Sequence, residues 1–211
     1  MSNAHNSKLE IFGKPIEKVN EYTYLGQIMA FNDRSNKILE VRIKKAWRNF
    51  WALKQFYKSK KLSVTAKTKI LETCTIPALL YGAQTWTLTK RQIKKLQATQ
   101  RRMERSILNL KLKDKVSIKK IRQKTKLKDV GYLAKKLKFK FIGHTYRASD
   151  NRWSRTLLEW WPYEHKRERG RPHTRFIDEI KNRVGKAWRR VTEDRVRWRK
   201  TGEVYARLWA V

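Results

Sequence analysis

Positive charge is the feature of this sequence that most restricts how the chain can fold. Lys and Arg number 53 against 18 Asp and Glu, which gives a formal net charge of +35. Repulsion on this scale destabilises a compact isolated chain, so a polyanion is the natural partner. Nucleic-acid phosphates fit that role best, and an anionic membrane surface is the competing partner.

Apolar residues are numerous enough to favour a folded chain despite the charge repulsion. They make up 40% of the 211 residues and include nine Trp, enough for a hydrophobic core and too many for wholesale disorder. No uncharged apolar run reaches the roughly 18 residues that a membrane-spanning helix needs. The expected partner is therefore nucleic acid and not a membrane.

The first ten residues, MSNAHNSKLE, lack the apolar core of a signal peptide. We interpret residues 1–10 as a flexible N-terminus or a tag remnant, and we expect a nuclear protein that is not secreted. Cys74 is the only cysteine, which excludes an internal disulfide and a multi-cysteine zinc site. The histidines share no metal-ligand spacing, so neither a metal nor a cofactor is expected.

The N-terminal part of the chain predicts a small sheet followed by a helical bundle. Residues 11–34 contain β-rich runs around the turn signal Gly13-Lys14-Pro15, which favours two or three strands. Over residues 35–142 apolar residues recur every three or four positions, as in amphipathic helices. The first helix is expected to bury Leu39, Ile43, Ala46, Phe50, Leu53 and Tyr57.

Local signals mark the ends of further helices in this region. Ser63 is expected to cap a helix that Pro77 should kink or end. Thr89 and Gln92 have the spacing of a capping box, which predicts the start of another helix. Its apolar face is expected at Ile93, Leu96, Met103, Ile107 and Leu110.

The basic residues change in kind along the chain. Residues 111–140 form a Lys-dense band that is expected to be a solvated helical surface. Its apolar residues on one face are Leu133, Leu137 and Phe141. From Arg147 onward there are fourteen Arg, four Lys and six of the nine Trp. Arg and Trp suit phosphate binding and stacking, unless the Trp only fill a core, so we place an Arg/Trp-rich helical module at residues 143–211.

Six segments follow one another along almost the whole chain. They are YTYLGQIM at 22–29, FWALKQFYKSKKLS at 50–63, LLYGAQTWTL at 79–88, FIGHTYRAS at 141–149, RERGRPHTRFIDEI at 167–180 and EDRVRWR at 193–199. This series, from Ile11 to Thr201, resembles the C-terminal part of non-LTR (LINE-type) retrotransposon reverse transcriptases. One departure is Phe176, where the pattern of that family leads us to expect Trp.

The resemblance implies a fragment that lacks the catalytic palm of those polymerases. The palm holds two metal ions with paired aspartates in a Phe-x-Asp-Asp turn, and no Asp-Asp pair occurs in this sequence. The chain is therefore expected not to be an enzyme on its own. Tyr24, Leu25 and Gly26 would lie in the strands that feed the primer-gripping edge, and the helices that follow would form the thumb.

The same resemblance implies how nucleic acid is held. A thumb helix lies along the minor groove of the template–primer duplex and contacts phosphates and sugars. Lys44, Lys45 and Arg48 are the candidates for these contacts, unless they are only the solvated face of a helix. Arg147 is a further candidate at the start of the Arg/Trp-rich module.

The segment Arg169-Gly170-Arg171-Pro172 allows two interpretations. It is the tetrapeptide of an AT-hook, a disordered arm that enters the minor groove of A·T-rich DNA. A helical pattern follows at once, with Thr174 in position to cap a helix that begins near Arg175. The pattern favours a joint between elements, in which Arg169, Arg171 and Arg175 can still bind an anion.

One segment of the sequence allows either part of a nuclease site or a helix. Glu179-Ile180-Lys181 formally ends such a pattern, with a distant Asp150 as its first carboxylate, but that site needs Glu and Lys on a strand. A helix is expected instead, because one helical face would hold Ile177, Ile180, Val184 and Trp188.

These observations predict a mainly α-helical fragment that binds nucleic acid. Its expected role is to hold an RNA–DNA or DNA duplex for reverse transcription, with a separate polymerase palm or a host protein as a further partner. Two alternatives stay open. One is a stand-alone, domesticated DNA- or RNA-binding protein derived from a retroelement, and the other is an inert remnant.

Overall fold

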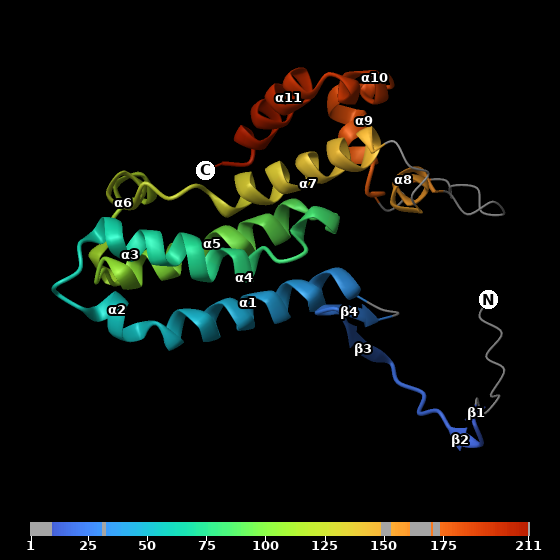
Figure 1. Cartoon of the computed structure of the whole chain (residues 1–211). Coiled ribbons are helices and arrows are strands. Elements are labelled where there is room, and N and C mark those ends of the chain that lie inside the picture. Colours follow the sequence, from blue (N-terminus) through green and yellow to red (C-terminus); the bar gives the residue numbers. More distant parts are fainter. Residues whose placement is uncertain (1–9, 31–32, 149–152, 161–169, 171–173, 211) are drawn as a thin grey trace.

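The computed structural model describes residues 10–30, 33–148, 153–160, 170 and 174–210. It is mainly helical, with two small strand pairs at the N-terminus that lead into helices, which confirms the expected fold class. Figure 1 shows the helices in layers, with α1 (Arg34–Ala52) on one side, α7 (Val130–Arg147) in the middle and α11 (Arg195–Arg207) on the other.

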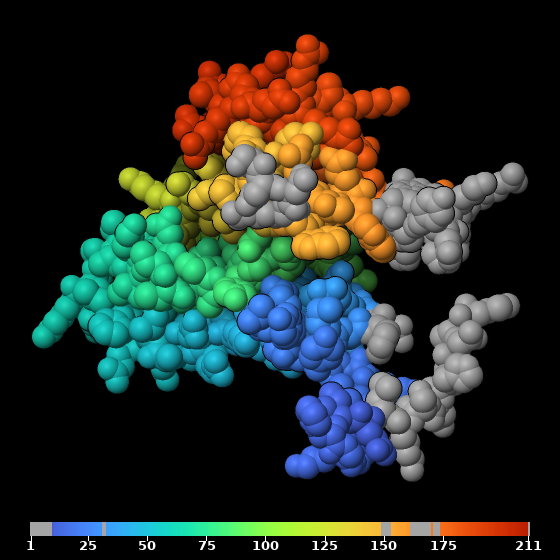
Figure 2. Space-filling model, turned by 45° about the vertical axis from the view of Figure 1, so that its right-hand side comes forward, coloured from blue at the N-terminus to red at the C-terminus, as the bar shows by residue number. Residues whose placement is uncertain are grey.

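The strands form two antiparallel hairpins. β1 (Glu10–Ile11) pairs with β2 (Lys14–Pro15), and β3 (Glu21–Tyr24) pairs with β4 (Gln27–Ala30). The first hairpin projects from the body of the molecule in Figure 2 and is exposed throughout, whereas β4 packs Ile28 against the helices. The described chain thus has four short strands where the sequence predicted two or three.

Shorter helices and turns connect the layers. In chain order they are α2 (Lys54–Lys58), α3 (Val64–Ile70), a π turn η1 (Leu71–Thr75), α4 (Ile76–Leu79), a 3-10 turn η2 (Ala83–Thr85), α5 (Lys90–Ile107), a 3-10 turn η3 (Leu112–Asp114), α6 (Ile118–Thr125), α8 (Trp153–Glu159), α9 (Asp178–Val184) and α10 (Trp188–Glu193). None of the helices in the described ranges has the length and apolar character needed to cross a membrane.

The helix ends predicted at Ser63, Pro77 and Thr89 are confirmed. The Ser63 hydroxyl accepts a hydrogen bond from the Ala66 amide at 3.2 Å. Thr89 and Gln92 form the capping box, because each backbone amide donates to the other side chain, at 2.9 and 3.2 Å. Around Pro77, which has no N–H to donate, the backbone passes through the π turn η1 and the short α4 and then leaves the helix.

Most of the predicted apolar faces are also confirmed. α1 ends at Ala52 and α2 continues the chain at an angle, so the first face spans two helices. Its fully buried members are Leu39, Ala46, Phe50 and Tyr57. In α5 the buried members are Ile93, Leu96, Met103 and Ile107.

Two hydrophobic clusters meet along α7. The first contains buried residues of α1, α4, α5 and the N-terminal half of α7, and the second joins the C-terminal half of α7 to α8, α9, α10 and α11. α7 runs unbroken through residue 143, where the change in composition suggested a module boundary. One helix therefore belongs to both clusters, and the division into separate domains stays a prediction.

The expectation of a solvated Lys-rich surface is wrong for α7. The side chains of Lys135 and Lys138 are only 3% and 2% exposed, and both bind the Glu179 carboxylate of α9. Each ammonium group also lies over an aromatic ring, 4.5 Å from the centre of Trp209 and 4.3 Å from that of Phe176. Sequence periodicity could not reveal this arrangement, because the counter-charge lies 44 and 41 positions further along the chain.

Glu179 is the carboxylate that two buried cations share. Burial raises the pKa of Glu179, but Lys138 and Lys135 lower it more, so the carboxylate stays ionised. Burial lowers the pKa of both lysines, and Glu179 opposes that effect. The Tyr205 hydroxyl of α11 also donates to Glu179, and burial followed by this bond raises the pKa of Tyr205. One carboxylate therefore joins α7, α9 and α11.

We predict that Glu179→Gln lowers the free energy of unfolding by about 3–5 kcal/mol, because two buried ammonium groups lose the carboxylate that both of them bind. Glu203→Gln is the matched control. Glu203 of α11 pairs at 3.1 Å with Lys136, which lies on α7 like the two buried lysines but is much more exposed. The control should cost far less stability. Denaturant unfolding followed by circular dichroism measures the stability of both variants. Equal losses of stability would contradict the role of the buried ion triad formed by Lys135, Glu179 and Lys138.

Candidate nucleic-acid interface

α1 presents the basic side chains that the thumb resemblance singles out. Lys44 and Arg48 lie one turn apart and are exposed, and Lys45 between them is half-buried. Glu40, one turn before Lys44, is instead paired with Lys95 of α5 at 2.9 Å. Among the described residues, no hydrogen bond or ion pair joins these three basic side chains to a carboxylate. Their charge is therefore available to an anion from solution.

The other predicted binding arginines lie in a different layer. Arg147 ends α7, and its Nη1 donates to the carbonyl oxygen of Thr192 in α10 at 2.8 Å. Burial, and then the charge of Arg195, lower the pKa of Arg147. Arg175 is half-buried just before α9. The structure thus places Arg147 beside another arginine and does not bring either predicted arginine into the α1 layer (Figure 1).

Arg169 and Arg171 lie outside the described residues. Between them, Gly170 is exposed and has a φ of +103°, a backbone conformation that favours glycine. A bend at Gly170 suits a joint between elements. The choice between a joint and an AT-hook stays a prediction.

Thr174 does not cap the helix that follows it, so this expectation is wrong. α9 begins only at Asp178, and the residue before it offers no side-chain cap. Instead the Asp178 carboxylate reaches back and accepts a hydrogen bond from the Arg175 amide at 2.9 Å. The bond between Arg175 and Asp178 has the geometry of one half of a capping box, and Thr174 takes no part in it.

Tyr24, Leu25 and Gly26 form the tip of the β3–β4 hairpin. Leu25 and Gly26 have φ values of +47° and +73°, as in the two-residue turns that close tight hairpins. Buried Arg42 of α1 donates to the carbonyl oxygen of Gly26 and lies 4.4 Å from the ring centre of Tyr81. A Cβ on Gly26 would lie 3.1 Å from Arg42. The turn of the first motif is therefore docked on α1 and on the LLYGAQTWTL segment.

The described residues do not form a nuclease site around Glu179 and Lys181. Glu179 and Lys181 lie on the helix α9, where Glu179 binds two lysines and Lys181 is exposed. Asp150 lies outside the described residues. Among the described residues, no group of three His, Cys, Asp or Glu side chains could hold a metal ion.

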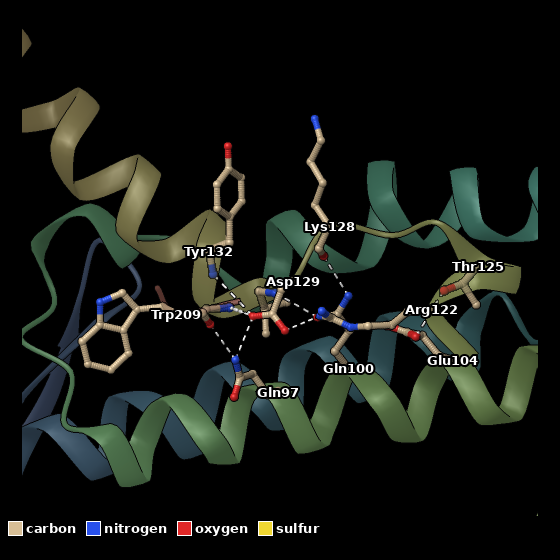
Figure 3. Close-up of polar contacts among 11 residues, drawn as sticks. Gln97, Gln100, Glu104, Arg122, Thr125, Lys128, Asp129, Tyr132 and Trp209 are labelled. Atoms are coloured by element: carbon tan, nitrogen blue, oxygen red, sulfur yellow. Dashed lines mark hydrogen bonds and ion pairs between the residues drawn. The ribbon is translucent and has the colours of Figure 1, made fainter. Parts of the chain in front are cut away.

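A buried polar network, which the sequence patterns did not reveal, fixes the start of α7 (Figure 3). Asp129 caps α7 by accepting from the Gly131 amide at 2.7 Å, and it also binds Arg122 of α6 and Gln97 of α5. Gln97 donates further to the carbonyl oxygen of Trp209 at 2.8 Å. The network therefore ties α5, α6, α7 and the C-terminal segment together. An Asp at the N-cap position was the one local signal of it.

Glu104 of α5 is a fully buried acid beside this network. The Thr125 hydroxyl donates to its Oε2 at 3.2 Å, and its Oε1 has no hydrogen-bond partner among the described residues. Burial raises the pKa of Glu104, against the opposing effects of Thr125, Arg122 and Arg101. Ionising this carboxyl in the folded protein therefore costs stability.

We predict that Glu104→Gln gains stability relative to the wild type as pH rises from about 4 to neutrality. The sign follows from the raised pKa of Glu104. Once the pH exceeds the pKa of this carboxyl in the unfolded chain, the folded wild type must either keep the proton or bury a charge, and both lower its stability. Glu203→Gln is the control, since Lys136 lowers the pKa of Glu203 and the pH trend should be reversed. Unfolding free energies at a series of pH values would refute the assignment if both variants followed the same trend.

Comparison with known proteins points to a mobile element. The chain is 27% identical over 208 residues to an uncharacterized transposon-derived protein of Caenorhabditis elegans, and the match covers 89% of this chain and 73% of that protein. No family model and no solved structure matches the chain. The similarity suggests a transposon origin.

Proposed function

We propose that the chain is the nucleic-acid-binding part of a retrotransposon-type reverse transcriptase, and that it holds the template–primer duplex without polymerase activity of its own. The transposon-derived relative and the order of the six sequence segments support this proposal. The ligand is an RNA–DNA or DNA duplex, the partner is a polymerase palm or a host protein, and the site of action is the nucleus.

The excess of exposed basic side chains over available carboxylates is the observation that carries the proposal. Most carboxylates of the described chain are engaged by the protein itself, either in ion pairs such as Glu40 with Lys95 or as helix caps such as Asp129 and Asp194. They are too few to neutralise all the exposed cations of a chain whose net charge is +35. Phosphates that bind such cations release counterions, which favours binding strongly at low salt.

We predict that replacing the three α1 cations with Ala weakens binding to an RNA–DNA duplex. The slope of log affinity against log salt should fall by up to about one for each lost phosphate contact. The residues are Lys44, Lys45 and Arg48. Fluorescence anisotropy of a labelled duplex over a range of salt concentrations measures both quantities.

The control removes the same charge from another helix. Three exposed lysines of α6 serve this purpose: Lys119, Lys120 and Lys124. Their replacement with Ala should change the salt slope less than the α1 replacement does. A wild-type protein that binds no nucleic acid would refute the proposed function, whereas an α1 variant with the wild-type slope would refute only the α1 contacts.

We also predict that the chain does not extend a primer with Mg²⁺ or Mn²⁺. Two-metal catalysis needs paired carboxylates, and the sequence contains no Asp-Asp pair. Primer extension by a purified preparation, abolished by substitutions within this chain, would refute the proposal. A preparation of unrelated basic protein carried through the same steps controls for contaminating polymerase.

A further inference from the structure

A basic groove of about 400 Å³ lies between α7 and α11. The cations on its walls are Lys136, Lys140 and Arg147 from α7 and Arg195 and Arg199 from α11, and His144 of α7 also lines it. Two of the α7 residues belong to the FIGHTYRAS segment, and both α11 residues belong to EDRVRWR. Two segments that lie far apart in the sequence therefore line one site, and the sequence patterns did not single out its α11 arginines.

Two glycines let the helices approach closely enough to fix the walls of the groove. A Cβ on Gly143 of α7 would lie 2.3 Å from Nε1 of Trp198, and a Cβ on Gly202 of α11 would lie 2.9 Å from Phe139. The buried Trp198 Nε1 donates to the carbonyl oxygen of Phe139 at 2.8 Å. These contacts set the distance between the cations of the two helices, so the groove exists before any ligand binds.

The carboxylates near the groove are already engaged. Glu203 pairs with Lys136 at one wall, at 3.1 Å. Asp194 caps α11 by accepting two backbone amide hydrogen bonds, both at 2.9 Å. Within the described ranges no carboxylate forms an ion pair or hydrogen bond with the other cations of the groove. An anion would relieve the repulsion that holds between neighbours such as Arg147 and Arg195.

We propose that this groove binds successive phosphates of one nucleic-acid strand, an inference that rests on the proposed function. The polar side chains that α7 contributes follow at steps of four or three residues, and four residues advance a helix by about 6 Å, similar to the spacing of neighbouring phosphates. Phe139 and Trp198 line the groove but are buried, so they offer no stacking face to a base. Binding is therefore independent of sequence. A strand can enter a concave groove, whereas a flat membrane surface cannot.

The test replaces the exposed groove cations that make no structural hydrogen bond: Lys140→Ala, Arg195→Ala and Arg199→Ala. Affinity for single-stranded RNA and for an RNA–DNA duplex should fall roughly tenfold or more at low salt, and the salt slope should fall by about two to three. The melting temperature should stay close to that of the wild type. Arg147 is kept, because its bond to Thr192 makes it part of the fold.

Two further variants make the result specific. The α6 variant with Ala at residues 119, 120 and 124 removes the same charge outside the groove and should keep most of the affinity. Lys140→Arg with Arg195→Lys and Arg199→Lys keeps the charge and should restore most of the binding. Equal losses in the groove and α6 variants would overturn the groove and leave the proposed function standing.

Two other outcomes decide the remaining possibilities. A wild-type chain that binds neither RNA nor DNA would overturn the proposed function and the groove with it. A groove variant that binds nucleic acid normally but no longer binds vesicles of anionic lipid would also overturn the strand site. The variant's melting temperature shows in each case that the comparison is made on folded protein.

Discussion

The ion triad of Lys135, Glu179 and Lys138 is the interaction on which the C-terminal half of the molecule depends. It fixes α9 on α7, and the Tyr205 hydroxyl extends it to α11. Buried ammonium groups are tolerated only with a carboxylate at bonding distance, so the position of α9 is determined by charge as much as by apolar packing. The groove between α7 and α11 exists because these helices are held in one arrangement.

The scarcity of acidic residues makes the surface strongly positive. A chain with 18 acidic and 53 basic residues cannot pair its cations internally, and the structure places several of its acids at caps and buried pairs. The acids that remain exposed are too few to balance the exposed Lys and Arg. This excess of cations is the physical link between the protein and a polyanionic ligand.

The segments that carry the resemblance to retrotransposon polymerases are contacts of the fold. Gly26 of the first segment meets Arg42 and Tyr81, so the hairpin turn is docked on the helices. Gly143 and Trp198 meet at the α7–α11 contact in the same way. A glycine at such a position lets two elements approach more closely than a side chain would allow. The similarity to a transposon-derived protein suggests a transposon origin for the chain that contains these segments.

Local signals were sufficient for the helical class, the capping box at Thr89 and the cap at Ser63, because a cap involves residues only three positions apart. They were misleading for Thr174, because α9 begins only at Asp178, whose carboxylate accepts from the Arg175 amide. The burial of Lys135, the groove cations of α11 and the network around Asp129 depended on partners from distant parts of the chain. Composition establishes that cations must remain in excess, whereas the packing of helices selects which of them are buried against a carboxylate and which face the groove, since a charge can be buried only where the fold brings its partner.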